Sequence, residues 1–171
     1  NETNTTQVIN NIIKSDYRLG IIRYAEKFDS YFKTMLEEKG LISELVTEFQ
    51  YVLLLNKDCP LAQQEIICKE DLKGYIEITH ADNFSPALPS ADVKKEELSG
   101  EIDKKIFVFD RGSQFDILSG NPNTFMWVSP VPAELLERYG LVHRICRGIS
   151  GVYRDMLVYR SNYRLTPLDK Q

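Results

Sequence analysis

The sequence predicts an α+β fold, with an N-terminal helical layer packed on a mostly antiparallel β-sheet that includes a C-terminal β-hairpin. Apolar residues recur at helical spacing through the first fifty positions. After Gly74, short alternating runs rich in β-branched and aromatic residues lie between turns that contain glycine or proline. The length of 171 residues fits a single domain over 1–171, mainly helical over 1–72 and mainly β over 73–171.

Two helices are expected at the start of the chain. An apolar stripe begins at Val8, and a longer helix follows a cap at Ser15 or Asp16. This second helix ends at Lys39-Gly40, because glycine accepts the left-handed conformation and lysine suits the negative end of a helix.

The next segment is expected to be helical as well. A third helix covers residues 43–53, although its apolar run to Leu55 also suits a strand. Pro60 lies in the first turn of a short helix that reaches about Cys68, since proline lacks the N–H that a first turn leaves unpaired.

The second half of the chain has the signals of strands and turns. Strands are expected at residues 75–80, 105–110 and 124–129. Residues 82–92 contain two prolines and several side chains that bond their own backbone, so they are expected to form a loop. Residues 133–139 suit one short helix, which Gly140 ends.

The C-terminal segment, residues 141–165, suits either a β-hairpin or a helix. In a hairpin, residues 148–151 form the turn. Tyr153 and Tyr159 then share one face, while Arg154 and Arg160 share the other. A helix is disfavoured because the two glycines of the turn would cost roughly 1 kcal/mol each relative to alanine.

The positive charge of the chain is distributed unevenly. Residues 106–169 contain seven arginines and no lysine, and six of these arginines lie in residues 138–164 with one acid, Asp155. That stretch carries +5, whereas the whole chain carries −4. Because the planar guanidinium group suits carboxylates and phosphates, the C-terminal segment is the leading candidate for function.

The leading hypothesis is therefore a binding or regulatory module that recognises an anionic small molecule or an acidic protein partner. The expected ligand-binding residues are Arg144, Arg147, Arg154, Arg160, Arg164, Tyr153, Tyr159 and Trp127. A nucleic acid is a less favoured partner, given the overall negative charge.

Each of these assignments has a structural alternative. The arginines also suit ion pairs with acidic helices of the same chain, or of a second copy in a homodimer. Trp127 lies in the most apolar run of the second half, so it suits either a ligand pocket or a central core strand.

The second hypothesis is a small enzyme acting on an anionic substrate. Its candidate acid–base groups are His80, Asp82, Asp110 and His143. We expect His143 to be neutral because Arg144 and Arg147 lie close in sequence. The chain has no metal-ligand spacing, no nucleophile motif and no cofactor motif, so no metal or cofactor is expected.

The cysteines and the hydropathy pattern bear on the compartment. Cys59, Cys68 and Cys146 are too few for a disulfide framework, so free thiols in the cytoplasm are favoured over a Cys59–Cys68 bridge. N-glycosylation patterns at Asn1, Asn4 and Asn83 keep secretion as the alternative. No apolar run approaches the length of a membrane span.

Overall fold

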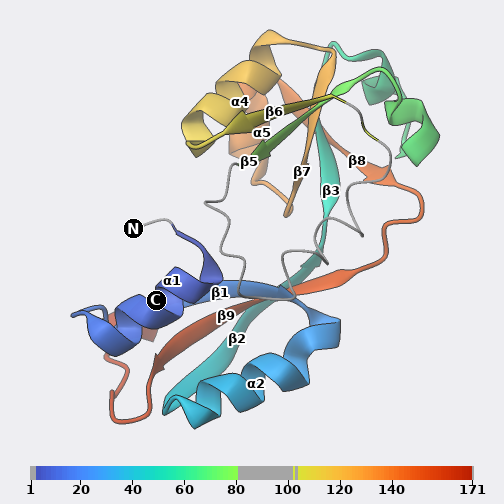
Figure 1. Cartoon of the computed structure of the whole chain (residues 1–171). Helices are drawn as coiled ribbons and strands as arrows, with labels where there is room; N and C mark the ends of the chain where they lie inside the picture. Colours follow the sequence, from blue (N-terminus) through green and yellow to red (C-terminus); the bar gives the residue numbers. More distant parts are fainter. Residues whose placement is uncertain (1–2, 81–101, 103, 171) are drawn as a thin grey trace. The chain divides into compact units, whose positions relative to one another are not determined.

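The computed structural model describes residues 3–80, 102 and 104–170, and the chain divides into two compact units (Figure 1). We call Asn1–Glu48 with Val152–Gln171 the terminal unit, and Phe49–Gly151 the central unit. The described residues form four α-helices and two β-sheets with antiparallel pairs, which confirms the α+β class.

The terminal unit contains a three-stranded sheet in the order β1-β9-β2. These strands are β1 (Leu19–Ala25), β9 (Val152–Arg160) and β2 (Leu41–Gln50). Strands β1 and β9 are antiparallel, with Leu19 opposite Tyr159 and Ala25 opposite Tyr153. This pairing brings the two ends of the chain into one sheet.

Two helices, α1 (Thr5–Lys14) and α2 (Asp29–Glu38), supply the rest of the terminal-unit core. The buried cluster consists of Ile9, Ile12, Ile22, Tyr24, Phe32, Leu36, Leu41, Met156 and Val158. Tyr24 stacks on Phe32 with ring centroids 4.3 Å apart. A glycine at position 20 allows the close approach of α1, since a Cβ there would lie 2.4 Å from Cγ1 of Val8.

The central unit contains a six-stranded mixed sheet in the order β4-β8-β3-β7-β5-β6. Its strands are β3 (Val52–Asn56), β4 (Ile66–Ile67), β5 (Ile76–His80), β6 (Lys105–Val108), β7 (Thr124–Val128) and β8 (Leu141–Cys146). Strand β3 is antiparallel to β7 and β8, whereas the β4–β8, β5–β6 and β5–β7 pairs are parallel.

Both faces of the central sheet are covered. Helices α4 (Arg111–Gly120) and α5 (Ala133–Tyr139) lie over one face and pack around Leu54 (Figure 1). The other face packs Leu53, Leu55 and Phe125 against the 3₁₀ turns at Pro60–Gln63 and Lys69–Leu72. The consecutive leucines of β3 are fully buried for this reason.

Several local predictions are confirmed. Strands β5, β6 and β7 lie within the ranges expected from alternation. Helix α5 covers residues 133–139 and ends at Gly140, which is left-handed with φ 63°. The second helix ends at Lys39-Gly40 as expected, and Gly40 has φ 69°. The expected loop at 82–92 lies outside the described residues.

Three helical predictions are wrong. Residues 19–25 form strand β1, and the expected helix over 43–53 is instead β2 followed by β3. The strand alternative for the apolar run to Leu55 is confirmed by β3. Strand β2 lies at the edge of its sheet, with Leu45 and Val46 on the surface. Its apolar residues therefore do not alternate as those of a half-buried strand do, and their spacing resembles that of a helix. The short helix after Pro60 stops at Gln63, and helix α4 was not anticipated.

The C-terminal segment is β-structure, but its two strands do not pair with each other. Strand β8 pairs with β3 and β4 in the central sheet, whereas β9 pairs with β1. Met156 and Val158, two residues apart on β9, both belong to the buried cluster of the terminal unit, as expected for alternate residues on one face of a strand. Strand preference reflects packing against cross-strand neighbours and burial, so the turn signal at residues 148–151 did not by itself determine the partners of β8 and β9.

No helix in the described ranges combines the length and the hydrophobicity that a membrane crossing requires.

Candidate functional site

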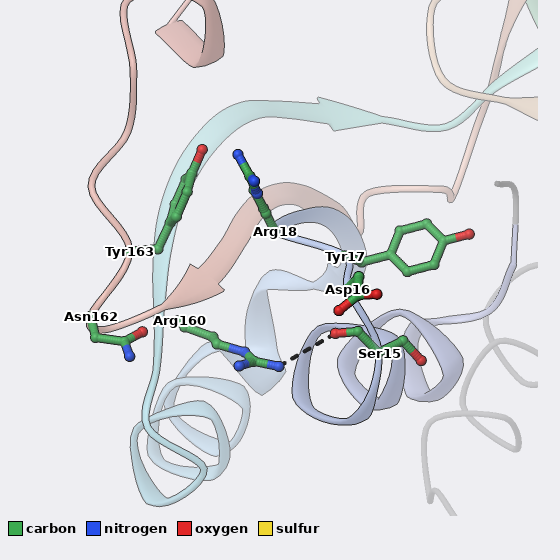
Figure 2. A pocket seen from close by; sticks show the side chains of 7 residues that line it. All are labelled: Ser15, Asp16, Tyr17, Arg18, Arg160, Asn162 and Tyr163. Atoms are coloured by element: carbon green, nitrogen blue, oxygen red, sulfur yellow. Dashed lines mark hydrogen bonds between the residues drawn. The ribbon is translucent and has the colours of Figure 1, made fainter.

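A surface pocket of about 290 Å³ lies in the terminal unit, where α1 and β9 end (Figure 2). Its lining residues come from two segments far apart in sequence: Ser15, Asp16, Tyr17 and Arg18, and Arg160, Asn162 and Tyr163. The pocket therefore includes one arginine of the C-terminal cluster and one, Arg18, from outside it.

The strand register explains why these segments meet. Helix α1 ends at Lys14, and Ser15 has an extended backbone that redirects the chain toward β1. Leu19, the first residue of β1, lies opposite Tyr159 of β9. The residue before Leu19 and the residue after Tyr159 are Arg18 and Arg160, so antiparallel pairing brings these two residues to one end of the sheet. Their side chains point in different directions, Arg18 toward Tyr163 and Arg160 toward Ser15 (Figure 2).

Arg160 is fixed by the C-terminal end of α1. Its Nε donates to the carbonyl of Ile12 at 2.8 Å, and its Nη2 donates to the carbonyls of Ile13 at 3.1 Å and Ser15 at 3.4 Å. These are carbonyls that a helix end leaves without internal partners, and the cation also suits the negative end of the helix. Within the described residues, Nη1 donates to no acceptor, so one edge of the guanidinium remains for a ligand.

Tyr163 forms another wall of the pocket and is held by Asp169. Its hydroxyl donates to Oδ2 of Asp169 at 2.9 Å. This hydrogen bond raises the pKa of Tyr163, and the neighbouring Arg18 opposes the change. Asp169 also accepts from the backbone N–H of Thr166 at 2.7 Å, so the segment after β9 has a defined conformation.

The lining of the pocket carries both signs of charge. Arg18 and Arg160 are cationic, and Asp16 is anionic. Serine, asparagine and tyrosine side chains add neutral hydrogen-bonding groups. Such a set can bind a small carboxylate or phosphate, because guanidinium groups form charge-assisted hydrogen bonds with both.

Arg154 is engaged with acids of the same chain. It contacts Glu26 at 2.8 Å, Asp29 at 3.0 Å and Glu48 at 2.6 Å. Hydrogen bonds to Glu48 and Asp29 raise the pKa of Arg154. For this residue, the expected alternative of an internal ion pair is confirmed. The arginine ties α2 and β2 to the central strand of the terminal sheet.

The other arginines of the cluster lie outside the pocket. Nε of Arg144 donates to the carbonyl of Ala62 at 2.9 Å, and Nη1 donates to the carbonyl of His143 at 2.6 Å. Arg147 and Arg164 are exposed. Arg144 thus stabilises the turn after Pro60, whereas the two exposed arginines remain accessible to a partner.

The aromatic candidates are mostly structural. Tyr153 and Tyr159 are buried, and the hydroxyl of Tyr159 donates to Glu44. Trp127 packs against the core cluster that contains Phe125, and the centroids of the two rings are 6.1 Å apart. Its indole Nε1 is buried, and no described residue accepts its hydrogen. None of these three side chains lines the pocket.

His143 lies in β8 and is partly buried. Its Nε2 accepts a hydrogen bond from the backbone N–H of Val131 at 3.1 Å. Burial lowers the pKa of His143 below its ordinary value. The expected neutrality therefore arises from desolvation rather than from the neighbouring arginines.

This environment predicts a specific pH dependence of stability. Because the folded-state pKa is lowered, the unfolded chain binds a proton more readily, and stability falls as the pH drops below about 6.5. In His143→Gln, whose amide oxygen can accept from Val131 without titrating, this component should be absent. Urea unfolding of both proteins on either side of that pH checks it. The same pH dependence in both would contradict the assignment.

Of the remaining acid–base candidates, His80 and Asp110 follow neighbouring strands. His80 ends β5 opposite Val108, the last residue of β6, so the backbone brings His80 and Asp110 to the same edge of the central sheet. Asp110 caps α4, accepting from the N–H of Ser113 at 2.8 Å and from its hydroxyl at 2.6 Å. Asp82 lies outside the described residues.

Metal-ligating side chains do not cluster in the part of the chain that the structure describes, where no group of three or more suits a metal ion. Cys59, Cys68 and Cys146 are free, as the cysteine count favoured. Burial raises the pKa of Cys146 to about 11, so its thiol is protonated near neutral pH.

Sequence reasoning missed Asp16 and Arg18 as site residues. Asp16 was expected as a candidate cap of the second helix and Arg18 lay within its first turn, and neither belongs to a charge cluster. Their relation to Arg160 depends on the pairing of β1 with β9, for which the local sequence carries no signal.

No protein-family model matches the sequence, and no curated protein matches it. Solved structures share the fold. The effector binding domain of QuiR in complex with shikimate has a TM-score of 0.67 and 18% identity, covering 98% of this chain and 73% of that one. The reduced form of OxyR has a TM-score of 0.62 and 14% identity, and the match covers 99% of this chain and 73% of that one. HinK, a LysR family transcriptional regulator from Pseudomonas aeruginosa, has a TM-score of 0.64 and 13% identity. The match covers 99% of this chain and 55% of HinK.

Proposed function

We propose that this chain is a ligand-binding regulatory module that recognises a small anionic ligand through the end of its Arg/Tyr-rich C-terminal segment. The observation that carries the proposal is the pocket in which Arg160 and Tyr163 of that segment meet Arg18. The regulatory part of the proposal is supported by the fold, which an effector binding domain in complex with shikimate shares over 98% of this chain.

The arrangement of Arg160 favours binding. An arginine on a mobile surface loses side-chain entropy when it holds a ligand, at a cost of about 0.5–1.5 kcal/mol for an immobilised long side chain. Here the contacts with the carbonyls of Ile12 and Ile13 already fix the guanidinium. A ligand carboxylate can therefore use an ordered donor, and the pocket is preorganised for it.

A small molecule suits this site better than an acidic protein, because the pocket is concave and draws on a few converging side chains. An acidic partner would instead use the exposed Arg147 and Arg164. Three further predictions from the sequence are retained with this proposal: a cytoplasmic location, a homodimer and a single domain over 1–171.

A thermal-shift screen with carboxylate metabolites, sugar phosphates, nucleotides and short oligonucleotides tests the proposal. A small anion at 100 times its Kd should stabilise the fold by about 2.7 kcal/mol. Arg18→Ala should lose most of this stabilisation, because it removes a donor of the pocket and no core contact. Arg147→Ala is the matched control, since it removes an exposed arginine of the central unit and should respond like the wild type.

Two results would contradict the proposal. If no small anion stabilises the protein, the pocket is not a ligand site. If Arg147→Ala weakens the response as much as Arg18→Ala does, binding depends on general positive charge. A response to oligonucleotides alone that disappears with added salt would likewise indicate a nonspecific phosphate-binding patch.

A further inference from the structure

We propose that the outer edge of strand β2 pairs with β2 of a second copy of this chain, so that two three-stranded sheets join into one continuous sheet. The two β2 strands run antiparallel over residues 42–48, and the two-fold axis of the dimer passes through Leu45. This inference goes beyond the proposed function, because it assigns an interface and depends on no ligand.

Strand β2 is long and lies at an edge of the terminal sheet (Figure 1). It covers ten residues, and within the described ranges β9 is the only strand that pairs with it. A row of N–H and C=O groups that points away from the neighbouring strand is a template for a further strand. The opposite edge of the sheet differs, since the hydroxyl of Thr5 in α1 donates to the carbonyl of Arg23 in β1 at 3.5 Å. Of the two edges, that of β2 is the better suited to strand addition.

The sequence of β2 lacks the features by which edge strands usually avoid pairing. Residues 41–50 contain no proline, glycine or lysine. The two acids of the strand, Glu44 and Glu48, accept hydrogen bonds from the hydroxyl of Tyr159 and from Nε of Arg154, both on β9. These carboxylates are therefore engaged within the sheet and do not protect its edge as free charges would.

Apolar side chains occupy the middle of this edge. Ile42, Leu45 and Val46 are 40%, 54% and 57% exposed. With the two-fold axis at Leu45, each Leu45 lies opposite the same residue of the second copy. On the other face, Val46 lies diagonal to Val46 and Ile42 of the second copy. Opposite and diagonal pairs of this kind stabilise antiparallel strands, so both faces of the joined sheet gain apolar contacts.

The acids of β2 select this register and favour a second copy as the partner. Directly opposite residues share a face, so a two-fold axis normal to the sheet must pass through a residue position. An axis at Val46 would place Glu44 opposite Glu48 at two positions, and an axis at Glu44 would place that acid opposite itself. Like charges in opposite positions are destabilising. The axis at Leu45 places both acids opposite apolar residues, so the strand is complementary to itself.

Sedimentation equilibrium of the intact chain tests the proposal. The wild type should dimerise in the micromolar concentration range, because two paired strands form a small interface. Leu45→Lys should raise the dissociation constant about tenfold or more, since it removes the apolar pair and places two lysines opposite each other. Ile21→Lys is the matched control, because Ile21 is 51% exposed on β1 of the same sheet. This variant should dimerise like the wild type.

Cysteine cross-linking tests the register independently of the lysine variants. With molecular oxygen and a copper catalyst, Leu45→Cys should form a disulfide between two copies, as the two opposite thiols give two protons and two electrons to the oxidant. Ile21→Cys should not exceed the background of the wild type, which retains Cys59, Cys68 and Cys146.

Three results would overturn the proposal. The first is a wild type that stays monomeric at every concentration, and the second is a dimer that Leu45→Lys leaves unchanged. The third is a dimer in which Leu45→Cys does not cross-link above the background, since the interface would then lie elsewhere. None of these results bears on the anion pocket, which the thermal-shift screen tests separately.

Discussion

Replacing Phe125 with alanine is expected to lower the free energy of unfolding by about 3–5 kcal/mol, the largest effect of any substitution considered. The ring is fully buried at 0% exposure and lies in β7 opposite Leu55. It packs against Leu53, Leu61 and other members of the central core, so its removal leaves a cavity that the close-packed sheet cannot fill. Urea unfolding followed by circular dichroism measures the change.

Phe107→Ala is the matched control. The same side chain is removed from β6 of the same sheet, where the ring is 65% exposed. Its loss should change stability by no more than about 0.5 kcal/mol. Equal destabilisation by the two substitutions would show that the described burial of the central unit is incorrect.

The second large effect is expected in the terminal unit, where Ile22→Ala should cost about 2–5 kcal/mol. Ile22 is 1% exposed, and on β1 it lies opposite Met156. It joins α1 and α2 to the sheet through the buried cluster that includes Ile12 and Phe32. The midpoint of urea unfolding again provides the measurement.

Its neighbour Ile21 is the control, because successive residues of a strand face opposite sides. Ile21 is 51% exposed, so Ile21→Ala should leave the midpoint nearly unchanged. If Ile21→Ala proved the more damaging substitution, the face of β1 assigned to the core would be wrong, and with it the register that brings Arg18 to Arg160.

The elements that sequence reasoning predicted correctly have strong local signals. Helix α5 is followed by Gly140, whose left-handed backbone ends it. Strands β5 and β7 contain β-branched or aromatic residues between clear turns. In these segments the local preference and the tertiary environment agree, so the pattern alone was sufficient.

The elements that were missed depend on distant partners. Strand β2 is exposed on most of its surface, so its apolar residues do not report a buried face. The prediction of a C-terminal hairpin was wrong for a related reason. The sequence indicated a turn at Gly148 but did not indicate the partners of β8 and β9. Pairing in a sheet is decided by burial across the whole chain rather than by neighbouring sequence.

The candidate site was predictable only in part. The arginine cluster directed attention to the C-terminal segment, and Arg160 does line the pocket. The distribution of charge along the sequence did not distinguish Arg160 from Arg154. In the structure, Arg154 forms ion pairs with three acids of the same unit. The distribution of charge also could not identify Arg18, which the β1–β9 register places at the site from the other end of the chain.

Nuclear magnetic resonance titration of the ¹⁵N-labelled chain with the tightest-binding anion tests the central claim most directly. The account predicts that chemical-shift changes concentrate on the backbone amides of residues 15–18 and 160–163, and that Arg18→Ala removes them. Changes concentrated within Phe49–Gly151 would contradict it, because the ligand would then bind the central unit and not the pocket formed by Arg18 and Arg160.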